Sequence, residues 1–375
     1  MARNKFLSFA LLYPLSRLYG CIVAVRNMMF NRGIFLKQHE PEIPVIVVGN
    51  ISVGGAGKTP HTEYIVSHLC RSYKIAVLSR GYKRKTKGFV LASPNSHVDD
   101  IGDESYQIYQ KFRNHGVTVA VCENRVKGIS EIHRLKPDVE LVVLDDAFQH
   151  RYVKPTVSVV LMEYNRPAFN DHLLPFGRLR EPISALNRAD IVVVTKCPEE
   201  MKPMETRIFK TKLNLFPYQK LFFSGYKYLP LEPVFPGEVS QSTLVRITDL
   251  TQNDAILSIT GVANPKPFIM HLKSYNAKVR IKRYSDHHRF THADMQSIFE
   301  KFNTMSGNRK IIITTEKDAV RLKSNPYFPP ELRAATYYMP ISVAFGEEFN
   351  EMVLEKTIQQ KLPRIRHIDE NVLTF

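Results

Sequence analysis

The sequence predicts an α/β fold in which a parallel sheet carries helices on both faces, followed by a second, smaller α/β unit and preceded by a helical segment. Two observations predict it. In the first half of the 375 residues, short and almost continuously apolar runs alternate with segments of helical length. A proline-rich stretch at 215–244 interrupts this alternation, and a similar pattern resumes after it. The chain is long enough to form two cores.

The expected strands of the first unit are short apolar runs. They are Val45–Val48, Ile75–Leu78, Val117–Val121, Leu141–Leu144, Val157–Met162 and Ile191–Thr195. The helices expected between the early strands are Thr62–Ser72, Glu104–Arg113 and Arg125–Leu135. Strands of this kind, separated by helices, form a parallel sheet covered on both faces, and ligands lie at the carboxyl ends of its strands.

The stretch 215–244 predicts a linker or a two-stranded connection. The second unit is expected to contain Ala255–Thr260, Val279–Arg283 and Lys310–Thr314 as strands, and Lys266–Tyr275 and His292–Thr304 as helices. We therefore divide the chain into an N-terminal helical segment at 1–38, a larger domain at 39–225 and a C-terminal α/β domain at 226–375. A cleft between the two α/β domains would be a natural substrate site.

The N-terminal segment is apolar but short. Phe6–Ser16 and Leu18–Val25 are uncharged runs separated by Arg17, whereas a membrane-spanning helix needs about 20 mainly apolar residues. We expect a pair of helices that lies in a membrane interface with Lys5, Arg17, Arg26 and Arg32 near the headgroups. Because Arg17 and Arg26 fall on opposite faces of one straight helix, this placement needs a break at Pro14 or Gly20, or snorkelling of the side chains. The alternative is an ordinary helix packed on the body of the protein.

The composition favours anionic partners. The chain carries 52 basic and 36 acidic residues, a formal net charge of +16, which suits nucleic acid, acidic phospholipid or a phosphorylated substrate. Its four cysteines form no C-x-x-C pair. This spacing argues against a disulfide framework and against a zinc site, and it suits a reducing compartment.

The stretch IPVIVVGNISVGGAGKT at 43–59 predicts a phosphate-binding loop between a strand and a helix. Glycines let backbone N–H groups approach phosphate oxygens, the lysine reaches the β- and γ-phosphates, and the threonine hydroxyl can bind Mg²⁺. The candidate nucleotide-binding residues are Ser52, Val53, Gly54, Gly55, Ala56, Gly57, Lys58 and Thr59. Ser52 stands where the usual pattern has its first glycine. A glycine-rich hairpin or surface loop is the alternative.

Paired aspartates follow the Leu141–Leu144 strand. Asp145 and Asp146 match the strand-end carboxylates that bind Mg²⁺ beside a phosphate loop. Which of the two binds the metal stays open, and a helix N-cap or turn is the alternative. Asp103, which opens a helix, is by default an N-cap, and Asp286-His287-His288 could be a polar turn. An Asp–His pair could instead serve as a base and its orienting partner.

Two further segments are weaker signals. DIVVVTKCP at 190–198 is similar to the guanine-reading loop of GTPases, but Pro198 stands where that loop has its aspartate, which disfavours GTP. The basic loop at 83–87 could contact a substrate phosphate or acidic lipid, or it could simply be solvated.

Taken together, these segments resemble the tetraacyldisaccharide 4′-kinase family of lipid A biosynthesis. The matching segments run in family order and are GNISVGGAGKTP at 49–60, SRGY at 79–82, GDE at 102–104, DDAFQH at 145–150, LREP at 179–182, GVANP at 261–265, DHH at 286–288 and TTEKD at 314–318. Ser52 fits the family, while Phe176, Arg178 and the basic loop differ from the family pattern.

The resemblance implies a P-loop kinase domain, with ATP and Mg²⁺, that phosphorylates the 4′-hydroxyl of a tetraacyldisaccharide 1-phosphate to give lipid IVA. It implies Lys58 and Thr59 as phosphate-loop residues, with Thr59, Asp145 and Asp146 at the metal. It also implies Asp103 as the catalytic base, His287 as its partner with His288 as second choice, and Arg180 and Glu181 near the site. It further implies a monotopic enzyme on the cytoplasmic face of the inner membrane.

Two other functions were weighed. A regulatory P-loop NTPase is disfavoured by Pro198 and by the second α/β domain. A nucleic-acid-binding ATPase would concentrate basic residues on one face among aromatic ones, whereas here they are spread along the chain. We therefore expect an acylated sugar substrate, a membrane surface as partner, no nucleic acid, and a monomer.

Overall fold

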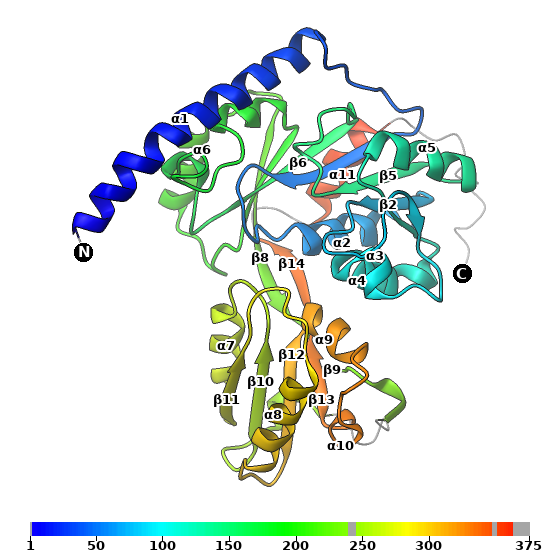
Figure 1. Ribbon diagram of the computed structural model, residues 1–375, viewed down its shortest axis with the longest axis vertical. Coiled ribbons are helices and arrows are strands. Elements are labelled where there is room, and N and C mark those ends of the chain that lie inside the picture. Colours follow the sequence, from blue (N-terminus) through cyan, green and yellow to red (C-terminus); the bar gives the residue numbers. More distant parts are fainter. Residues whose placement is uncertain (1, 239–244, 347–350, 363–375) are drawn as a thin grey trace.

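The structure, a computed structural model, describes residues 2–238, 245–346 and 351–362. It contains two sheets, one above the other along the long axis of the molecule (Figure 1). The larger has nine strands in the order β14-β8-β7-β6-β1-β5-β2-β4-β3, and the smaller has five in the order β11-β10-β12-β13-β9. Met1, 239–244 of the expected connection, and 347–350 and 363–375 of the expected C-terminal domain lie outside the described residues.

The larger sheet is parallel except at its two edges, where β3 and β14 are antiparallel to their neighbours. Its strands are β1 (Val45–Asn50), β2 (Ile75–Ser79), β3 (Val90–Leu91), β4 (Thr118–Val121), β5 (Leu141–Asp145), β6 (Val157–Glu163), β7 (Ile191–Thr195), β8 (Lys220–Tyr228) and β14 (Ile341–Phe345). β1 lies between β5 and β6, so the phosphate loop and the Asp145–Asp146 turn leave adjacent strands at the same edge.

Helices cover both faces of this sheet. One face packs against α2 (Lys58–Leu69), α4 (Asp103–Phe112) and α11 (Glu351–Lys361). The other packs against α5 (Arg125–Leu135) and α6 (Pro203–Leu213). Short elements are α3 (Val98–Ile101) and the 3-10 turns η1 (Arg113–His115), η2 (Ala168–Asn170), η3 (Ile183–Arg188), η4 (Pro236–Glu238) and η6 (Ile247–Asp249). The predicted α/β fold with helices on both faces is thus confirmed.

The smaller sheet is parallel except at β9. It contains β9 (Glu232–Pro233), β10 (Ala255–Thr260), β11 (Lys278–Arg283), β12 (Lys310–Thr315) and β13 (Thr336–Met339). Its helices are α7 (Lys266–Lys273), α8 (His292–Asn303), α9 (Glu316–Lys323) and α10 (Pro330–Arg333). The expected strands and helices of this unit are present, with α7 ending two residues early.

The two sheets are joined by a pair of antiparallel strands. β8 runs towards β9, β13 runs back into β14, and the Leu229 N–H donates to the Pro340 carbonyl between them at 2.9 Å. The chain therefore crosses between the sheets twice, and β14 and α11 return to the larger one. A boundary at residue 225 falls inside β8, so the division of the chain into domains stays a prediction.

The N-terminal segment is one helix, α1 (Ala2–Arg32), with Pro14 inside it. The prediction of a pair of helices was wrong, because α1 continues through Pro14 and Gly20, and from Ser16 onward one of its faces is bound to the larger sheet's loops. Ser16 Oγ donates to the Leu173 carbonyl at 2.8 Å, and Tyr19 Oη donates to the Arg180 carbonyl at 2.9 Å. Gly20 allows this close approach, since an added Cβ would lie 2.9 Å from Leu173 Cδ1.

The opposite face of α1 is apolar and points outward. Its exposed residues recur every three or four positions and are Leu11, Leu15, Leu18, Ile22, Val25 and Met28. We call these six residues the outer stripe. No helix in the described part of the chain has the length and hydropathy to cross a membrane.

His61 links α2 to the strand pair. Its Nδ1–H donates to the Gly57 carbonyl at 2.7 Å, and its Nε2 lies 2.8 Å from Ser224 Oγ on β8. Because a carbonyl oxygen only accepts, Nδ1 carries the hydrogen and Nε2 accepts from the serine. Burial lowers the pKa of His61 to about 4, against the opposing effect of its hydrogen bond to Gly57.

We predict that His61 makes the fold acid-sensitive. A folded-state pKa below the unfolded one means that the unfolded chain binds more protons, so stability is present above pH 6.5 and is lost as pH falls towards 4. The shift corresponds to roughly 3 kcal/mol. Urea denaturation at pH 7 and at pH 5 should show that the free energy of unfolding falls less between these pH values in His61→Gln than in the wild type. His115→Gln, at an exposed histidine, should keep the wild-type loss; equal pH dependence in all three would contradict this role.

Candidate active site

The segment between β1 and α2 forms a clamped loop. The Val53 N–H donates to the Arg178 carbonyl at 2.8 Å, and Thr195 Oγ1 at the end of β7 donates to the Ala56 carbonyl at 2.9 Å. At the start of the loop, Asn50 Nδ2 donates to the Ser52 carbonyl at 2.7 Å. Side chains of β1 and β7 and the loop that carries Arg178 thus fix the backbone of residues 52–57. Lys58 and Thr59 follow in the first turn of α2.

The glycines of this loop have two different tasks. An added Cβ at Gly54 or Gly55 would meet no atom within 4 Å, so this side of the loop is open. Gly57 has φ +86°, and an added Cβ would lie only 2.0 Å from Tyr226 Oη on β8. The loop is therefore closely packed against β8 at Gly57 and open at Gly54 and Gly55. It lies directly before the N–H groups of the α2 N-terminus, which favour an anion.

Lys58 lies beside the aspartates that follow β5. Its Nζ is 3.6 Å from Asp146 Oδ1, and Arg180 Nη1 is 3.4 Å from the same oxygen. Asp146 adopts φ +48°, a conformation that costs free energy for a residue other than glycine. The structure therefore brings Lys58, Asp146 and Arg180 together.

Asp145 is buried one residue earlier. Thr62 Oγ1 donates to its Oδ1 at 3.0 Å. Burial, together with the charges of Glu104 and Asp146, raises the pKa of Asp145 to about 7, against the opposing effects of Lys58 and of the hydrogen bond from Thr62. Among the described residues no group of three His, Cys, Asp or Glu side chains could hold a metal by itself. A hydroxyl and one or two carboxylates instead fit Mg²⁺, which keeps several waters and takes the remaining ligands from phosphate.

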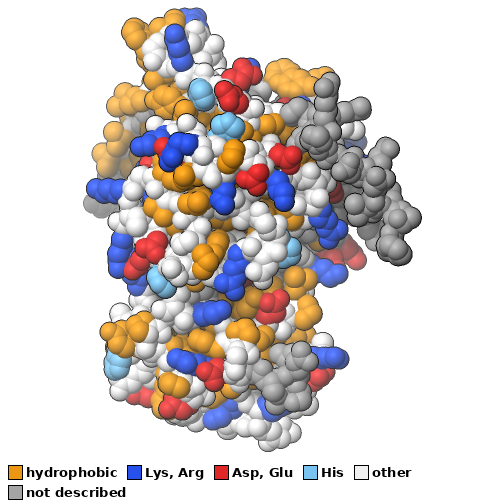
Figure 2. Space-filling model, turned by 90° about the vertical axis from the view of Figure 1, so that its right-hand side faces the viewer, with side chains coloured by type: hydrophobic (Ala, Val, Ile, Leu, Met, Phe, Trp, Pro, Cys, Tyr) orange, Lys and Arg blue, Asp and Glu red, His pale blue; other side chains and the backbone are white. Residues whose placement is uncertain are grey.

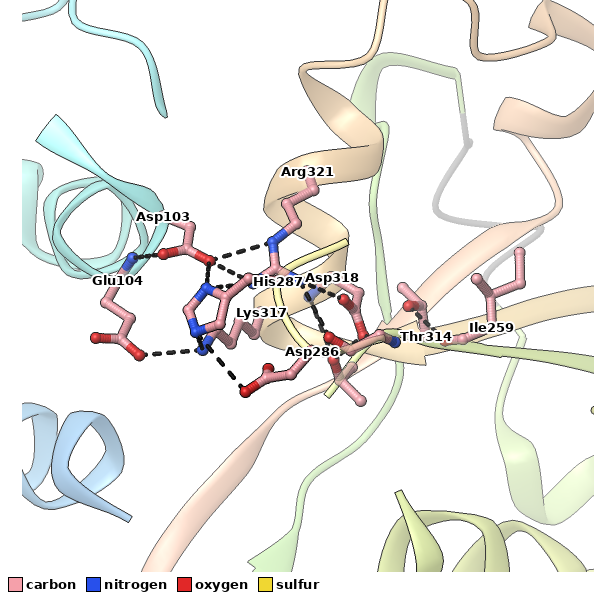
Figure 3. Close-up of polar contacts among 11 residues, drawn as sticks. Asp103, Glu104, Ile259, Asp286, His287, Thr314, Lys317, Asp318 and Arg321 are labelled. Atoms are coloured by element: carbon pink, nitrogen blue, oxygen red, sulfur yellow. Dashed lines mark hydrogen bonds and ion pairs between the residues drawn. The ribbon is translucent and has the colours of Figure 1, made fainter. Parts of the chain in front are cut away.

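Asp103 and His287 meet across the two sheets (Figure 3). Asp103 is the first residue of α4 on the larger sheet, and its Oδ2 lies 2.8 Å from His287 Nδ1, which follows β11 of the smaller sheet. His288 points elsewhere, because its Nε2 lies 2.9 Å from Asp294 Oδ2. His287 is thus the histidine that reaches Asp103, although 184 positions separate the two in sequence.

Two cations of α9 complete this cluster. Arg321 binds Asp103 Oδ2 through Nη2 and through Nε at 3.2 Å, and Lys317 Nζ lies 3.0 Å from His287 Nε2. Burial alone would raise the pKa of Asp103, but the hydrogen bond with His287 and the charges of Lys317 and Arg321 lower it well below its usual range. Asp103 is therefore a buried carboxylate that stays ionised.

The phosphate loop and the Asp103 cluster are neighbours. Buried Gln107 of α4 donates to Glu63 of α2 at 2.8 Å, which ties the two helices together. Glu104, next to Asp103, is close enough to Asp145 to raise the pKa of that carboxyl group. Both sets of side chains therefore line one region at the carboxyl edge of the larger sheet.

Some predicted residues lie differently. Glu181 is buried, and its Oε2 accepts from Arg188 at 2.7 Å and from Asn27 of α1 at 3.2 Å, so it supports the loop that carries Arg180. In the basic loop, Lys85 pairs with Asp99 and Arg84 with Glu123. Sequence reasoning gave no role to Lys317 and Arg321. The TTEKD segment was the one signal that included the lysine.

Comparison with known proteins identifies relatives along almost the whole chain. The family model described as tetraacyldisaccharide-1-P 4′-kinase matches residues 8–359. The tetraacyldisaccharide 4′-kinase of Bacteroides thetaiotaomicron is 47% identical over 352 residues, 92% of each chain. That of Flavobacterium johnsoniae is 42% identical over 335 residues, 89% of this chain and 92% of the relative.

A solved structure shows the same fold. LpxK from Aquifex aeolicus, an "apo" form in complex with ATP, aligns with a TM-score of 0.69 and 26% identity. The alignment covers 96% of this chain and 99% of that one.

We predict that Gly57 is needed for the loop to close on β8. Gly57→Ala adds a Cβ at positive φ against Tyr226 and should lower the free energy of unfolding by about 1–3 kcal/mol. Gly55→Ala, at an open position without positive φ, should change it by less than about 0.5 kcal/mol. Urea denaturation of both variants measures the difference, and equal stabilities would contradict the close packing at Gly57.

Proposed function

The chain belongs to the tetraacyldisaccharide-1-P 4′-kinase family, and from that premise we propose which of its residues perform the transfer. It uses ATP to phosphorylate the 4′-hydroxyl of tetraacyldisaccharide 1-phosphate, which gives lipid IVA in lipid A biosynthesis. The family favours this activity over a regulatory P-loop NTPase. The observation that carries the residue assignment is the meeting of Asp103 and His287 next to the phosphate loop.

The nucleotide's phosphates are held at the open side of the loop. Backbone N–H groups around Gly54 and Gly55 and at the α2 N-terminus face anionic oxygens there, and Lys58 neutralises charge on the β- and γ-phosphates. Arg180, already beside Asp146, adds a second cation near the same position. Alignment and charge neutralisation supply most of the catalysis in phosphoryl transfer.

Thr59, Asp145 and Asp146 are the residues that would hold Mg²⁺. When bound, the ion neutralises phosphate charge and orients the transferring group. The protein fits it because Asp145 is buried against two other carboxylates, Glu104 and Asp146, with Lys58 as the opposing charge. A cation at this position would favour the ionised form of Asp145.

Asp103 receives the proton of the sugar hydroxyl. Its Oδ2 is occupied by His287 and Arg321, whereas within the described part of the chain its Oδ1 accepts only the Glu104 N–H, at 3.0 Å. A carboxylate oxygen has two acceptor positions, so Oδ1 can also accept from the hydroxyl. As the hydroxyl oxygen bonds to the γ-phosphorus, the bond from that phosphorus to the bridging oxygen breaks, ADP leaves, and the hydroxyl hydrogen moves to Oδ1. This base resembles the aspartate that accepts the substrate hydroxyl proton in protein kinases.

The outer stripe of α1 contacts the membrane surface. It offers six exposed apolar side chains in line, and Arg17 lies exposed beside them. Arg26, another of the four cations expected near headgroups, instead donates to the Gln149 carbonyl on the protein side. We assign the enzyme to the cytoplasmic face of the inner membrane, where ATP is available.

Two further assignments concern partners. The phosphate loop, Asp103 and His287 all come from one chain, which suits a monomer. Nucleic acid is not assigned as a partner, because on the face drawn in Figure 2 basic side chains alternate with acidic and apolar ones instead of forming a continuous patch.

Asp103→Asn should lower turnover by about 10²–10⁴-fold because the variant keeps the shape but cannot take a proton. We would incubate the protein with labelled ATP and tetraacyldisaccharide 1-phosphate, analyse the lipid product, and measure ATP affinity separately. ATP affinity should be unchanged. The control Asp99→Asn, at a partly buried aspartate nearby, should keep full turnover. Near-normal turnover of Asp103→Asn would remove the base assignment, and absence of a phosphorylated lipid with the wild type would remove the function.

Replacing Leu11, Leu18 and Ile22 by serine should weaken vesicle binding by at least about tenfold, because apolar side chains no longer enter the lipid. Sedimentation with vesicles of anionic phospholipid measures the bound fraction. The control Met270→Ser removes an exposed apolar side chain from α7, far from α1 in Figure 1. If the triple variant sediments like the wild type, the outer stripe is not the membrane contact.

A further inference from the structure

Lys317 is held at the junction of the two sheets by its position in α9. Thr315 Oγ1 accepts the Asp318 N–H at 3.2 Å and caps the helix, so Lys317 stands in the first turn. Asp318 Oδ2 accepts the Gly261 N–H at 2.8 Å, which ties this turn to the end of β10. The Lys317 ammonium group then lies between Glu104 Oε1 and His287 Nε2, at 3.0 Å from each (Figure 3).

The partners of His287 determine which of its ring nitrogens carries the hydrogen. An ammonium group can only donate, so Nε2, which faces Lys317, must be the acceptor. Nδ1 therefore carries the hydrogen and donates it to Asp103 Oδ2. Asp286 Oδ2, the acceptor that would favour a hydrogen on Nε2, is 3.9 Å from that atom and out of hydrogen-bond range.

A doubly protonated ring does not fit the same contacts. It would place an N–H at Nε2 against the ammonium group of Lys317, with two donors and no acceptor between them. Arg321 Nη2 lies 3.3 Å from Nδ1, but both groups are donors, and they are close because they bind the same oxygen of Asp103. All these contacts together leave one arrangement of hydrogens, in which the imidazole is neutral.

We propose that Lys317 is a positioning residue for the transfer, because it fixes His287 as the neutral tautomer with hydrogen on Nδ1. In that form the imidazole donates to Asp103 Oδ2 and leaves Oδ1 as the oxygen that receives the hydroxyl proton. This inference rests on the proposed role of Asp103 as the base. It adds that a lysine of the smaller sheet, outside the phosphate-binding region, decides which oxygen of that base is available.

Glu104 is the second half of this arrangement. Its Oε1 accepts from Lys317, so it holds the ammonium group in place from the side of the larger sheet. Removing Lys317 leaves His287 Nε2 without its donor and leaves Asp286 as the nearest acidic neighbour of that nitrogen. The ring then gains a hydrogen at Nε2, and Nδ1 is no longer constrained to carry the hydrogen that it donates to Asp103 Oδ2.

The primary test is the tautomer of His287 in the full-length wild-type protein. Two-bond ¹H–¹⁵N correlation spectra of ¹⁵N-histidine-labelled protein distinguish the two neutral tautomers from the charged ring. The signal is assigned by its loss in His287→Gln. We expect the pattern of a ring with hydrogen on Nδ1 alone. A ring with hydrogen on Nε2, alone or in addition, overturns the proposal without any variant at position 317.

The second test uses Lys317→Met and the conservative variant Lys317→Arg. In the methionine variant the His287 signal should change to a ring that carries hydrogen on Nε2, and kcat should fall at least about tenfold with the KM for ATP unchanged. Lys317→Arg keeps a donor at this position and should therefore keep the wild-type tautomer of His287 and most of the wild-type kcat. Lys323→Met, at an exposed lysine of the same helix, should leave both unchanged.

The outcomes separate this proposal from the proposed function. If Lys317→Met is folded by circular dichroism and keeps the wild-type tautomer and kcat, Lys317 does not position His287. If Lys317→Met does not fold, Glu104→Leu, which removes the acceptor that holds the ammonium group, replaces it and should show the same change of tautomer with a smaller loss of kcat; an unaltered tautomer there also refutes the proposal. Failure of the base assignment appears instead as normal turnover of Asp103→Asn, whatever the tautomer of His287.

Discussion

The structure depends on one buried charge cluster, in which Asp103 of the larger sheet is bound by His287 and Arg321 of the smaller one. Burying these charges is unfavourable unless each finds its partners, and a carboxylate left alone here would be strongly destabilising. The cluster therefore holds the two sheets in one relative position. It also sets the electrostatic state of the proposed base, so the contact that joins the sheets is the one that prepares the chemistry.

The strand pair between the sheets acts on the phosphate loop from the other side. β8 belongs to the larger sheet, continues towards the smaller one, and carries both Ser224, the partner of His61, and Tyr226, which packs against Gly57. The loop is thus supported by the same strand that connects the sheets. The shape of the phosphate loop and the placement of the smaller sheet therefore both depend on β8, although the paired residues are more than 160 positions apart in sequence.

The sequence predicted the buried strands and the phosphate loop well because these depend on local patterns: apolar runs such as Val45–Val48, and glycines before Lys58. It predicted 215–244 only as a linker or a two-stranded connection, because Lys220–Tyr228 carries polar residues among apolar ones and lies inside the proline-rich stretch, and it did not predict β14. The pairing of Asp103 with His287 came from family resemblance, since nothing local links positions so distant. Lys317 appeared in the sequence only as part of the matching segment TTEKD, because its proposed role depends on its contact with His287 Nε2 in the folded protein.

Helix α1 is fully formed and hydrogen-bonded to the body through Ser16 and Tyr19 while its outer stripe stays uncovered. Segments that fold only on contact with a partner lose conformational entropy at that moment, which weakens their affinity. Binding of a surface to the outer stripe has no such entropy cost, because the helix is already ordered. Attachment and release at the proposed membrane contact would therefore be rigid-body events that leave the fold of the protein unchanged.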